Sequence, residues 1–350
     1  MGFLEKHPKL AIATVVLIGL LLVVVSAELS LRFFGSLNIH YYTGHSKPGM
    51  HEYPYGTIPI NSDGSPDEEF IPVASKKRIG YFGDSVTYGV GVGYGHRIPD
   101  LLQATFPAYQ HWVFAQVGAV PQALEVSREI TKHQLSTVVY LMNLNDILPD
   151  EQSPEVLGVT ASELSKIATR TSFLGRADEA LRGRSYLYTY VRLGLKNALQ
   201  RAGYEAHGQL AYELRPKQHH RVVSQTAERV VKFSEALSSQ GVKVCVILLP
   251  YEMQVSSDAA LTYARLGFSW EEGFLEGSTQ VALLQPLRQG GVNVYDAREA
   301  FSGLRLKVGE AFVYDKGDKI DWNHPNRFGH ARIAAWLSGL PAFWQQCLPG

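Results

Sequence analysis

Residues 78–85 read Arg-Ile-Gly-Tyr-Phe-Gly-Asp-Ser, a short and largely apolar run that ends at a Gly-Asp-Ser turn. Four later runs have the same form, each closed by turn residues, at 111–117, 137–142, 242–249 and 292–295. Strands of a parallel sheet have this composition because both faces of the sheet are covered. The pattern therefore predicts five buried strands, of which the first covers 78–82.

Helical patterns separate or follow these runs, at 98–106, 122–134, 221–239, 280–289 and 327–346. Strands that alternate with helices predict an α/β fold, here a doubly wound, flavodoxin-like and mostly parallel five-stranded sheet with helices on both faces. Ligands of such sheets bind beyond the carboxyl ends of the strands. The polar turns that follow the five runs fall at those ends.

One stretch, from 149 to about 220, breaks this alternation. It holds no convincing strand, and its segment 185–197 is strongly amphipathic, so we predict a helical insertion. Residues 161–201 carry eight Lys or Arg against three Asp or Glu. This excess fits either a solvated helical face or contact with anionic headgroups or an anionic polymer, and the sequence leaves both open.

Residues 10–27 form an apolar stretch of 18 residues without a charge, preceded by Lys6 and Lys9. A membrane-spanning helix needs roughly 20 residues at about 1.5 Å each, so the stretch meets the lower length. The two lysines favour a cytoplasmic N-terminus. The sequence therefore predicts an N-terminal membrane anchor over 1–34, with the rest of the chain outside the cytoplasm, in the periplasm of a Gram-negative cell.

A cleavable signal peptide is the alternative, because Val25-Ser26-Ala27 resembles a small-residue cleavage site. The apolar stretch is longer than the usual core of about 7–15 residues, and 28–34 continues the helical pattern, which favours an uncut anchor. From 35 to 77 the chain is rich in Gly, Pro, Tyr and polar residues without periodicity. We predict an extended stalk there, lying over a domain formed by 78–350.

Charge and cysteine content exclude several classes of protein. Lys and Arg together number 33, as do Asp and Glu, so net charge gives no reason to expect a nucleic-acid partner. The two cysteines, Cys245 and Cys347, form neither a disulfide framework nor a metal site, and Cys245 is expected to be an ordinary core residue. We predict no cofactor.

Four short blocks carry the chemistry: the Gly-Asp-Ser turn with Ser85, then Gly118, then the Asn-Leu-Asn-Asp turn at 143–146, and late in the chain Asp321 with His324. Asp and His three residues apart on a loop can share a hydrogen bond that prepares the imidazole to take a proton from a serine. Each block alone also fits a helix cap or an ordinary turn. Asp84 is expected to brace its turn.

Other nucleophile and metal motifs are missing. Residue 87 is a threonine, so no G-x-S-x-G elbow surrounds Ser85, and no H-E-x-x-H or P-loop pattern occurs. Taken together and in this order, the four blocks resemble the SGNH (GDSL-like) hydrolase superfamily, of the membrane-anchored bacterial type. The resemblance covers roughly 78–346.

The resemblance implies a role for each matched residue. Ser85 is the nucleophile, His324 the general base and acid, and Asp321 the residue that orients the imidazole. The oxyanion hole consists of the backbone N–H groups of Ser85 and Gly118 and the side chain of Asn145. The chain departs from the family at Asn143, where a glycine is usual, so we expect a reshaped pocket wall.

These roles predict a serine esterase that acts outside the cytoplasm on O-acyl groups, such as acetyl, of a glycan or a lipid. Two alternatives stay open: an O-acetyltransferase with the same three residues, and a non-catalytic, membrane-tethered accessory subunit. The expected partners are a small-molecule or glycan acyl ester and the membrane. The sequence names no protein partner.

Overall fold

A computed structural model of the chain describes residues 8–35, 44–149, 181, 184–201, 213–265, 270–313 and 321–348. At its centre lies a five-stranded sheet in which all neighbouring strands are parallel. The strands are β3 (Arg78–Gly83), β4 (Gln110–Ala115), β5 (Thr137–Met142), β6 (Lys243–Leu248) and β7 (Asn293–Asp296). Their order, β4-β3-β5-β6-β7, is that of a flavodoxin-like sheet. The five predicted strands are confirmed.

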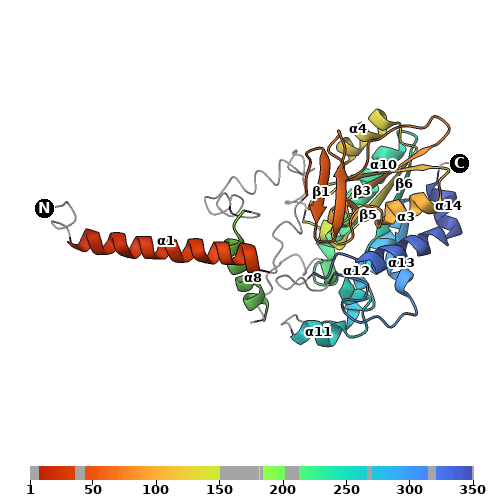
Figure 1. Cartoon of the computed structure of the whole chain (residues 1–350). Coiled ribbons are helices and arrows are strands. Elements are labelled where there is room, and N and C mark those ends of the chain that lie inside the picture. Colours follow the sequence, from red (N-terminus) through yellow and green to blue (C-terminus); the bar gives the residue numbers. More distant parts are fainter. Residues whose placement is uncertain are drawn as a thin grey trace.

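Helices cover both faces of this sheet (Figure 1). Along β5, Val138 and Tyr140 face one apolar core whereas Val139 and Leu141 face the other. The first core is closed by α4 (Ala123–His133), α10 (His220–Ser238) and α12 (Ser278–Gln289), and the second by α3 (Ile98–Thr105), α13 (Arg327–Ser338) and α14 (Pro341–Cys347). The sheet is therefore doubly wound, as predicted, and its near-continuous apolar strands follow from burial on both faces.

Short elements fill the connections: α11 (Ala259–Arg265) and the 3-10 turns η4 (Glu272–Phe274) and η5 (Ala297–Phe301). The prediction of a single helix over 327–346 is wrong, because α13 and α14 are separate. Gly339 ends α13, and Pro341 stands at the start of α14. A proline has no N–H to donate and clashes with the preceding turn, so it is favoured at the start of a helix and disfavoured in its interior.

A hairpin lies within the range predicted as a stalk. Strands β1 (Gly49–Tyr53) and β2 (Gly56–Ile60) pair antiparallel. Ile58 and Ile60 pack with Tyr88 and Val90 of the α/β domain in a small third core. This hairpin was not predicted, because its strands are short and lack a regular alternation of apolar and polar residues.

The polar chain that follows the hairpin is also bound to the domain. Arg97 is fully buried, and its guanidinium bonds to Asp100 and lies 3.6 Å from Asp67. The other carboxylate oxygen of Asp67 accepts a hydrogen bond of 2.8 Å from the Val113 N–H in β4. A buried arginine needs such partners because an unpaired charge in the core is costly. Asp67 therefore holds this part of the 35–77 range against the sheet.

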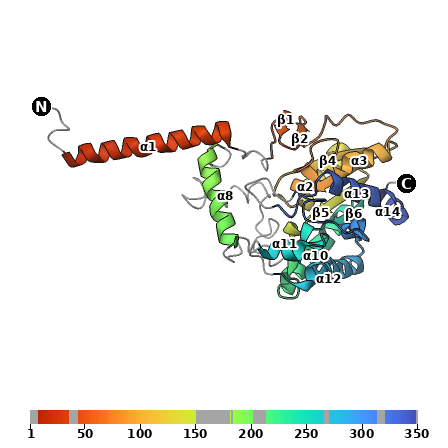
Figure 2. The same cartoon turned by 60° about the horizontal axis from the view of Figure 1, so that its bottom comes forward.

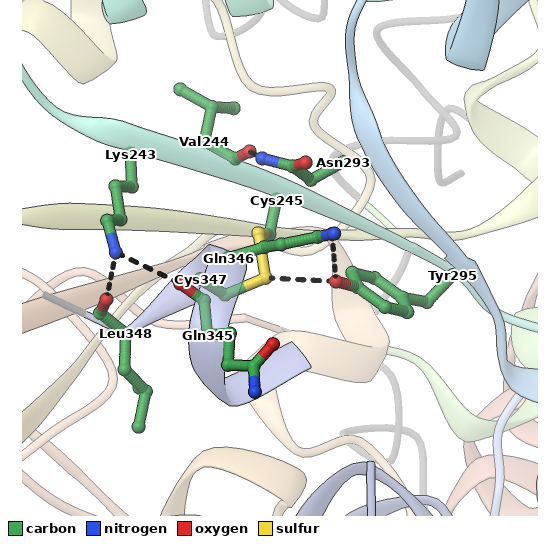
Figure 3. The surroundings of a disulfide bond; sticks show 9 residues. All are labelled: Lys243, Val244, Cys245, Asn293, Tyr295, Gln345, Gln346, Cys347 and Leu348. Carbon is green, nitrogen blue, oxygen red and sulfur yellow. Dashed lines mark hydrogen bonds between the residues drawn. A yellow bond between two sulfur atoms is a disulfide. The ribbon is translucent and has the colours of Figure 1, made fainter. Parts of the chain in front are cut away.

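Cys245 and Cys347 form a disulfide, which corrects the expectation that Cys245 is an ordinary core residue. The bond joins the middle of β6 to the end of α14, 102 residues later in the chain (Figure 3). Lys243 adds a second tie, donating from its ammonium group to the backbone oxygens of Gln345 and Leu348. The C-terminal helix is thus fixed to the central sheet by covalent and polar contacts.

The N-terminal helix α1 (Pro8–Phe34) extends away from the α/β domain, and α8 (Tyr186–Arg201) lies across its end (Figures 1 and 2). The segment Ile12–Phe34 is long and apolar enough to cross a membrane, a test that a signal sequence also passes, and none of it is buried. It is therefore not a core helix of this domain. Of the predicted insertion at 149–220, most lies outside the described residues, and α8 covers the amphipathic segment.

Removing the disulfide should destabilise the fold. A bond that closes a loop of about 100 residues stabilises a protein by roughly 2–5 kcal/mol, mainly by restricting the unfolded chain. We expect the double variant Cys245→Ala/Cys347→Ala to lose about this much unfolding free energy in urea titrations. A reducing agent should lower the midpoint of the wild type but not that of the variant. An unchanged wild-type midpoint after reduction would contradict the structural role of the bond.

Candidate active site

The carboxyl ends of the parallel strands carry the predicted polar blocks. Ser85 opens the short helix α2 (Ser85–Tyr88) directly after β3, and the turn η1 (Leu144–Asp146) follows β5. The loop with Asp321 and His324 precedes α13. Because β3 and β5 are parallel neighbours, their carboxyl ends meet at one edge of the sheet.

Ser85, His324 and Asp321 form one continuous chain of hydrogen bonds. The Ser85 Oγ lies 2.8 Å from His324 Nε2, although the two residues are 239 apart in sequence. His324 Nδ1 lies 2.8 Å from both carboxylate oxygens of Asp321. An ionised carboxylate only accepts hydrogen bonds, so Nδ1 carries the proton and Nε2 is left as the acceptor for the serine hydroxyl. All three side chains are buried.

The loop that carries Asp321 and His324 is held from both sides. The Asp321 Oδ1 accepts the His324 backbone N–H at 3.2 Å, and the His324 carbonyl accepts the Val313 N–H at 2.9 Å. Asn326 caps α13, accepting hydrogen bonds of 2.9 and 3.1 Å from two N–H groups in its first turn. The imidazole is therefore oriented in the free protein, so no reorganisation is needed when a substrate binds.

Gly83 allows the Ser85 turn to pass close to β5. A Cβ at this residue would lie 2.2 Å from the Thr87 Oγ1 and 2.8 Å from the Leu141 carbonyl oxygen. Only glycine fits such a close backbone approach. Any larger residue would shift the turn and with it the Ser85 hydroxyl.

Asp84 connects the Ser85 turn to the turn after β5. Its Oδ1 caps α2 by accepting the Val86 N–H at 3.0 Å, which confirms the predicted bracing role. Its Oδ2 accepts the Asn145 Nδ2 at 2.9 Å and lies 3.2 Å from the Ser85 Oγ. The Asn145 Oδ1 is buried without a hydrogen-bond partner among the described residues. Asp84 thus holds the predicted oxyanion-hole amide beside the predicted nucleophile.

Asn143, which stands where the family usually has glycine, is fully buried. Its Oδ1 accepts the Leu144 N–H at 2.8 Å, and its Nδ2 lies 3.4 Å from the Asp84 Oδ2. A side chain therefore lies beside Asp84 where a glycine would leave space.

Gly118 lies in the turn after β4 with φ of +74°, a left-handed conformation that favours glycine. A Cβ built there meets no atom within 4 Å. Within the described part of the chain its N–H makes no hydrogen bond. A donor is thus available, and its oxyanion role stays a prediction.

Two further buried carboxyls lie near Asp84. Asp146 accepts the Tyr140 O–H at 2.7 Å, and burial, with the nearby Asp84 charge, raises its pKa well above the usual value. Glu213 accepts the Tyr251 O–H at 2.7 Å, and burial together with Asp84 raises its pKa to about 7. Among the described residues, no three His, Cys, Asp or Glu side chains converge to hold a metal ion.

Glu252, which the sequence analysis missed, supports the loop of Asp321. It starts the turn η3 (Glu252–Gln254) after β6, and its N–H donates to the Trp322 carbonyl at 2.8 Å. Its buried carboxyl accepts the Tyr263 O–H at 2.6 Å and the Gly309 N–H at 2.5 Å. Burial raises its pKa to about 7, assisted by the charge of Asp321. The sequence feature that could have indicated Glu252 was its place just after the fourth predicted strand, where polar residues of the site are expected.

A cavity of about 730 Å³ opens beside the Ser85 turn. Neither Ser85 nor His324 lines it. Its walls combine aromatic, aliphatic, amide and charged side chains from β3, α2, the turn after β4 and α4, among them Phe82, Tyr88, Gln116, Val117, Glu125 and Arg128. A lining of this kind suits a polar ligand better than a long hydrocarbon chain.

Replacing Glu252 should change how stability depends on pH. The pKa of its carboxyl is about 7 in the folded chain, against about 4.3 when unfolded. The folded state therefore holds the extra proton between these values, and this group lowers stability as pH rises through them. We expect Glu252→Gln to gain stability relative to the wild type between pH 5 and pH 8 in urea titrations. A difference that stays constant across this range would contradict the assignment.

No protein-family model and no curated protein matches this chain. Similar solved structures include the psychrotrophic esterase EstA from Pseudoalteromonas, at 9% identity over 77% of this chain and 99% of that chain, with a TM-score of 0.38. A GDSL-like lipase from Bacteroides thetaiotaomicron is 12% identical over 77% of this chain and 89% of that chain, with a TM-score of 0.37. A mutant of Axe2, an acetylxylan esterase from Geobacillus stearothermophilus, is 14% identical over 79% of this chain and 96% of that chain, with a TM-score of 0.37. TM-scores this low establish neither fold nor function, and the strand order and the site geometry stand by themselves.

Proposed function

We propose that this chain is a serine esterase of the SGNH type that acts outside the cytoplasm on O-acyl groups through an acyl-enzyme on Ser85. The observation that carries the proposal is the hydrogen-bonded chain from Ser85 Oγ through His324 to Asp321. A serine hydroxyl becomes a nucleophile when an oriented imidazole takes its proton.

The first half of the reaction forms the acyl-enzyme. His324 Nε2 takes the Ser85 proton while Oγ attacks the ester carbonyl carbon, and Asp321 stabilises the imidazolium. The C–O bond to the alcohol then breaks, and the alcohol leaves with the proton from Nε2.

The second half releases the acyl group. His324 takes a proton from water, whose oxygen attacks the acyl carbon, and the proton returns to Ser85 as the carboxylic acid leaves. If a sugar hydroxyl replaces this water, the same steps give an O-acyltransferase.

The oxyanion in both halves needs donors that are already in place. We assign the backbone N–H groups of Ser85 and Gly118 and the Nδ2 group of Asn145. The Asn145 amide carries two hydrogens, so one can stay on Asp84 while the other faces the oxyanion.

Two independent features support action outside the cytoplasm. The apolar helix Ile12–Phe34 is preceded by Lys6 and Lys9, an arrangement that favours a cytoplasmic N-terminus. The Cys245–Cys347 disulfide is typical of proteins in oxidising compartments. The polar cavity beside the Ser85 turn favours acetyl groups on a glycan as the substrate.

Ser85→Ala should abolish labelling by a fluorophosphonate probe and hydrolysis of p-nitrophenyl acetate, because both require the activated hydroxyl. The control is Ser302→Ala, which removes an exposed serine and should leave labelling intact. Folded wild-type protein without an adduct on Ser85 would instead support a non-catalytic accessory role. Comparing free acetate with acetylated product in the presence of glycan then separates esterase from transferase.

Asn145→Ala should lower kcat by about 10²–10³ without unfolding the chain, since one oxyanion donor is typically worth that factor. The control is Asn293→Ala, which removes an amide from β7 at the far edge of the sheet. Steady-state kinetics and thermal unfolding of both variants give the comparison. A loss below about tenfold would remove Asn145 from the oxyanion hole and leave it only its bond to Asp84.

A further inference from the structure

Glu28, in the last part of α1, binds the amino end of α8. Its two carboxylate oxygens accept the Tyr186 N–H at 3.0 Å and the Leu187 N–H at 2.8 Å. The Ser185 hydroxyl donates to the same carboxylate at 2.9 Å. The first N–H groups of a helix lack partners within the helix and attract negative charge. The Glu28 carboxylate therefore caps α8 from a different helix.

Arg32, one turn after Glu28, strengthens this junction. Its Nε donates to the Glu28 carboxylate at 2.7 Å, and its guanidinium also donates to the Arg184 carbonyl. The same guanidinium lies over the Tyr186 ring at 5.2 Å, a cation–π distance. The start of α8 is thus fixed to the end of α1 by backbone, ionic and aromatic contacts, and the two helices cannot move apart without breaking them.

The junction lies at the expected depth of the lipid headgroups. The uncharged stretch 10–27 has 18 residues. At about 1.5 Å per residue it spans roughly 27 Å, close to the hydrocarbon thickness of about 30 Å. Glu28 and Arg32 are the first charged residues after it, so they meet the headgroup layer on the outer side.

The direction of α8 then follows from that of α1. In both views α8 runs crosswise to α1, at the end of α1 that is nearer the α/β domain (Figures 1 and 2). A helix that starts at headgroup depth and runs crosswise to a spanning helix extends along the membrane surface. With 16 residues, α8 covers about 24 Å of it.

The composition of α8 suits this place. Val191 and Leu195 are 62% and 61% exposed and lie four residues apart, on one face of the helix. Between 184 and 201 the sequence holds four basic residues and no acidic one. Exposed apolar side chains together with net positive charge are typical of helices that lie in the interface of membranes with anionic lipids.

We infer that α8 is an interfacial helix that lies on the outer leaflet of the bilayer in which α1 is embedded, inserting Val191 and Leu195 among anionic lipids. The inference rests on the proposed membrane anchor. The chain then contacts the membrane at two places, and the second contact restrains rotation of α1 about its own axis, because Glu28 holds α8 on α1.

Fluorescence quenching tests this contact. The full chain is placed in nanodiscs of phosphatidylcholine and phosphatidylglycerol with a nitroxide lipid, and a cysteine at Leu195→Cys carries an NBD label. Native cysteines do not interfere, because both are in the disulfide. The matched control is Val281→Cys, an equally exposed aliphatic residue on α12. We expect the label at 195 to lose about half of its fluorescence or more and the label at 281 to stay bright.

Glu28→Ala added to Leu195→Cys should return the fluorescence toward the level of the control, because α8 loses its attachment to α1. Hydrolysis of soluble p-nitrophenyl acetate should not change in any of these variants. Equal brightness at 195 and 281 in protein that stays in the discs would overturn the inference while the anchor stands. Equal quenching in pure phosphatidylcholine would overturn the preference for anionic lipids.

Release of a chain that begins after residue 27 would overturn both the anchor and the interfacial helix. That outcome would leave the serine chemistry untouched, because labelling of Ser85 by the fluorophosphonate probe measures it independently.

Discussion

The parallel pairing of β3 with β5 is the constraint on which the rest of the structure depends. The register sets Gly83 opposite Leu141, and the turn at Gly83 is so close to β5 that a Cβ would touch the Leu141 carbonyl oxygen. Parallel strands end at the same edge of a sheet, so the Ser85 turn and the Asn145 turn become neighbours. One carboxylate, that of Asp84, then accepts hydrogen bonds from both turns, from the Val86 N–H and from the Asn145 amide.

Several carboxyl groups are buried at this edge of the sheet, and each is stabilised there by hydrogen bonds. Asp321 accepts a hydrogen bond from a histidine, whereas Asp146, Glu213 and Glu252 each accept a hydrogen bond from a tyrosine. Burial raises the pKa of these three carboxyls, so they bind a proton more readily and leave less uncompensated charge in the core. The ordinary cost of burying acids is therefore limited, while the hydrogen bonds fix the turns that surround Ser85.

Two long-range links lie outside this edge. The disulfide holds α14 on β6, on the face of the sheet that also carries α3 and α13. The bonds from Glu28 hold α8 on α1. The first link stabilises the α/β domain, and the second connects the described part of the insertion to the apolar helix. The first link therefore acts within the α/β domain, whereas the second acts between α1 and α8.

The five strands and the two-layer helical cover followed from the sequence alone, because buried parallel strands are short apolar runs. The grouping of Ser85, Asp321 and His324 was implied by the resemblance to SGNH hydrolases, since each block alone also fits a helix cap or an ordinary turn. The break between α13 and α14 was also readable, at Gly339 and Pro341, although the prediction overlooked it.

Other features were decided only by the tertiary structure. The pairing of Cys245 with Cys347 depends on how α14 returns to β6 across 102 residues, which no spacing rule reveals. Glu252 comes next to the site because β6 lies beside β5, and Glu213 because it accepts a hydrogen bond from Tyr251, just after β6. Burial and hydrogen-bond partners on other segments determine the pKa and the orientation of their side chains. The capping of α8 by Glu28 has the same origin, because a hydrogen bond between residues more than a hundred apart leaves no local pattern in the chain.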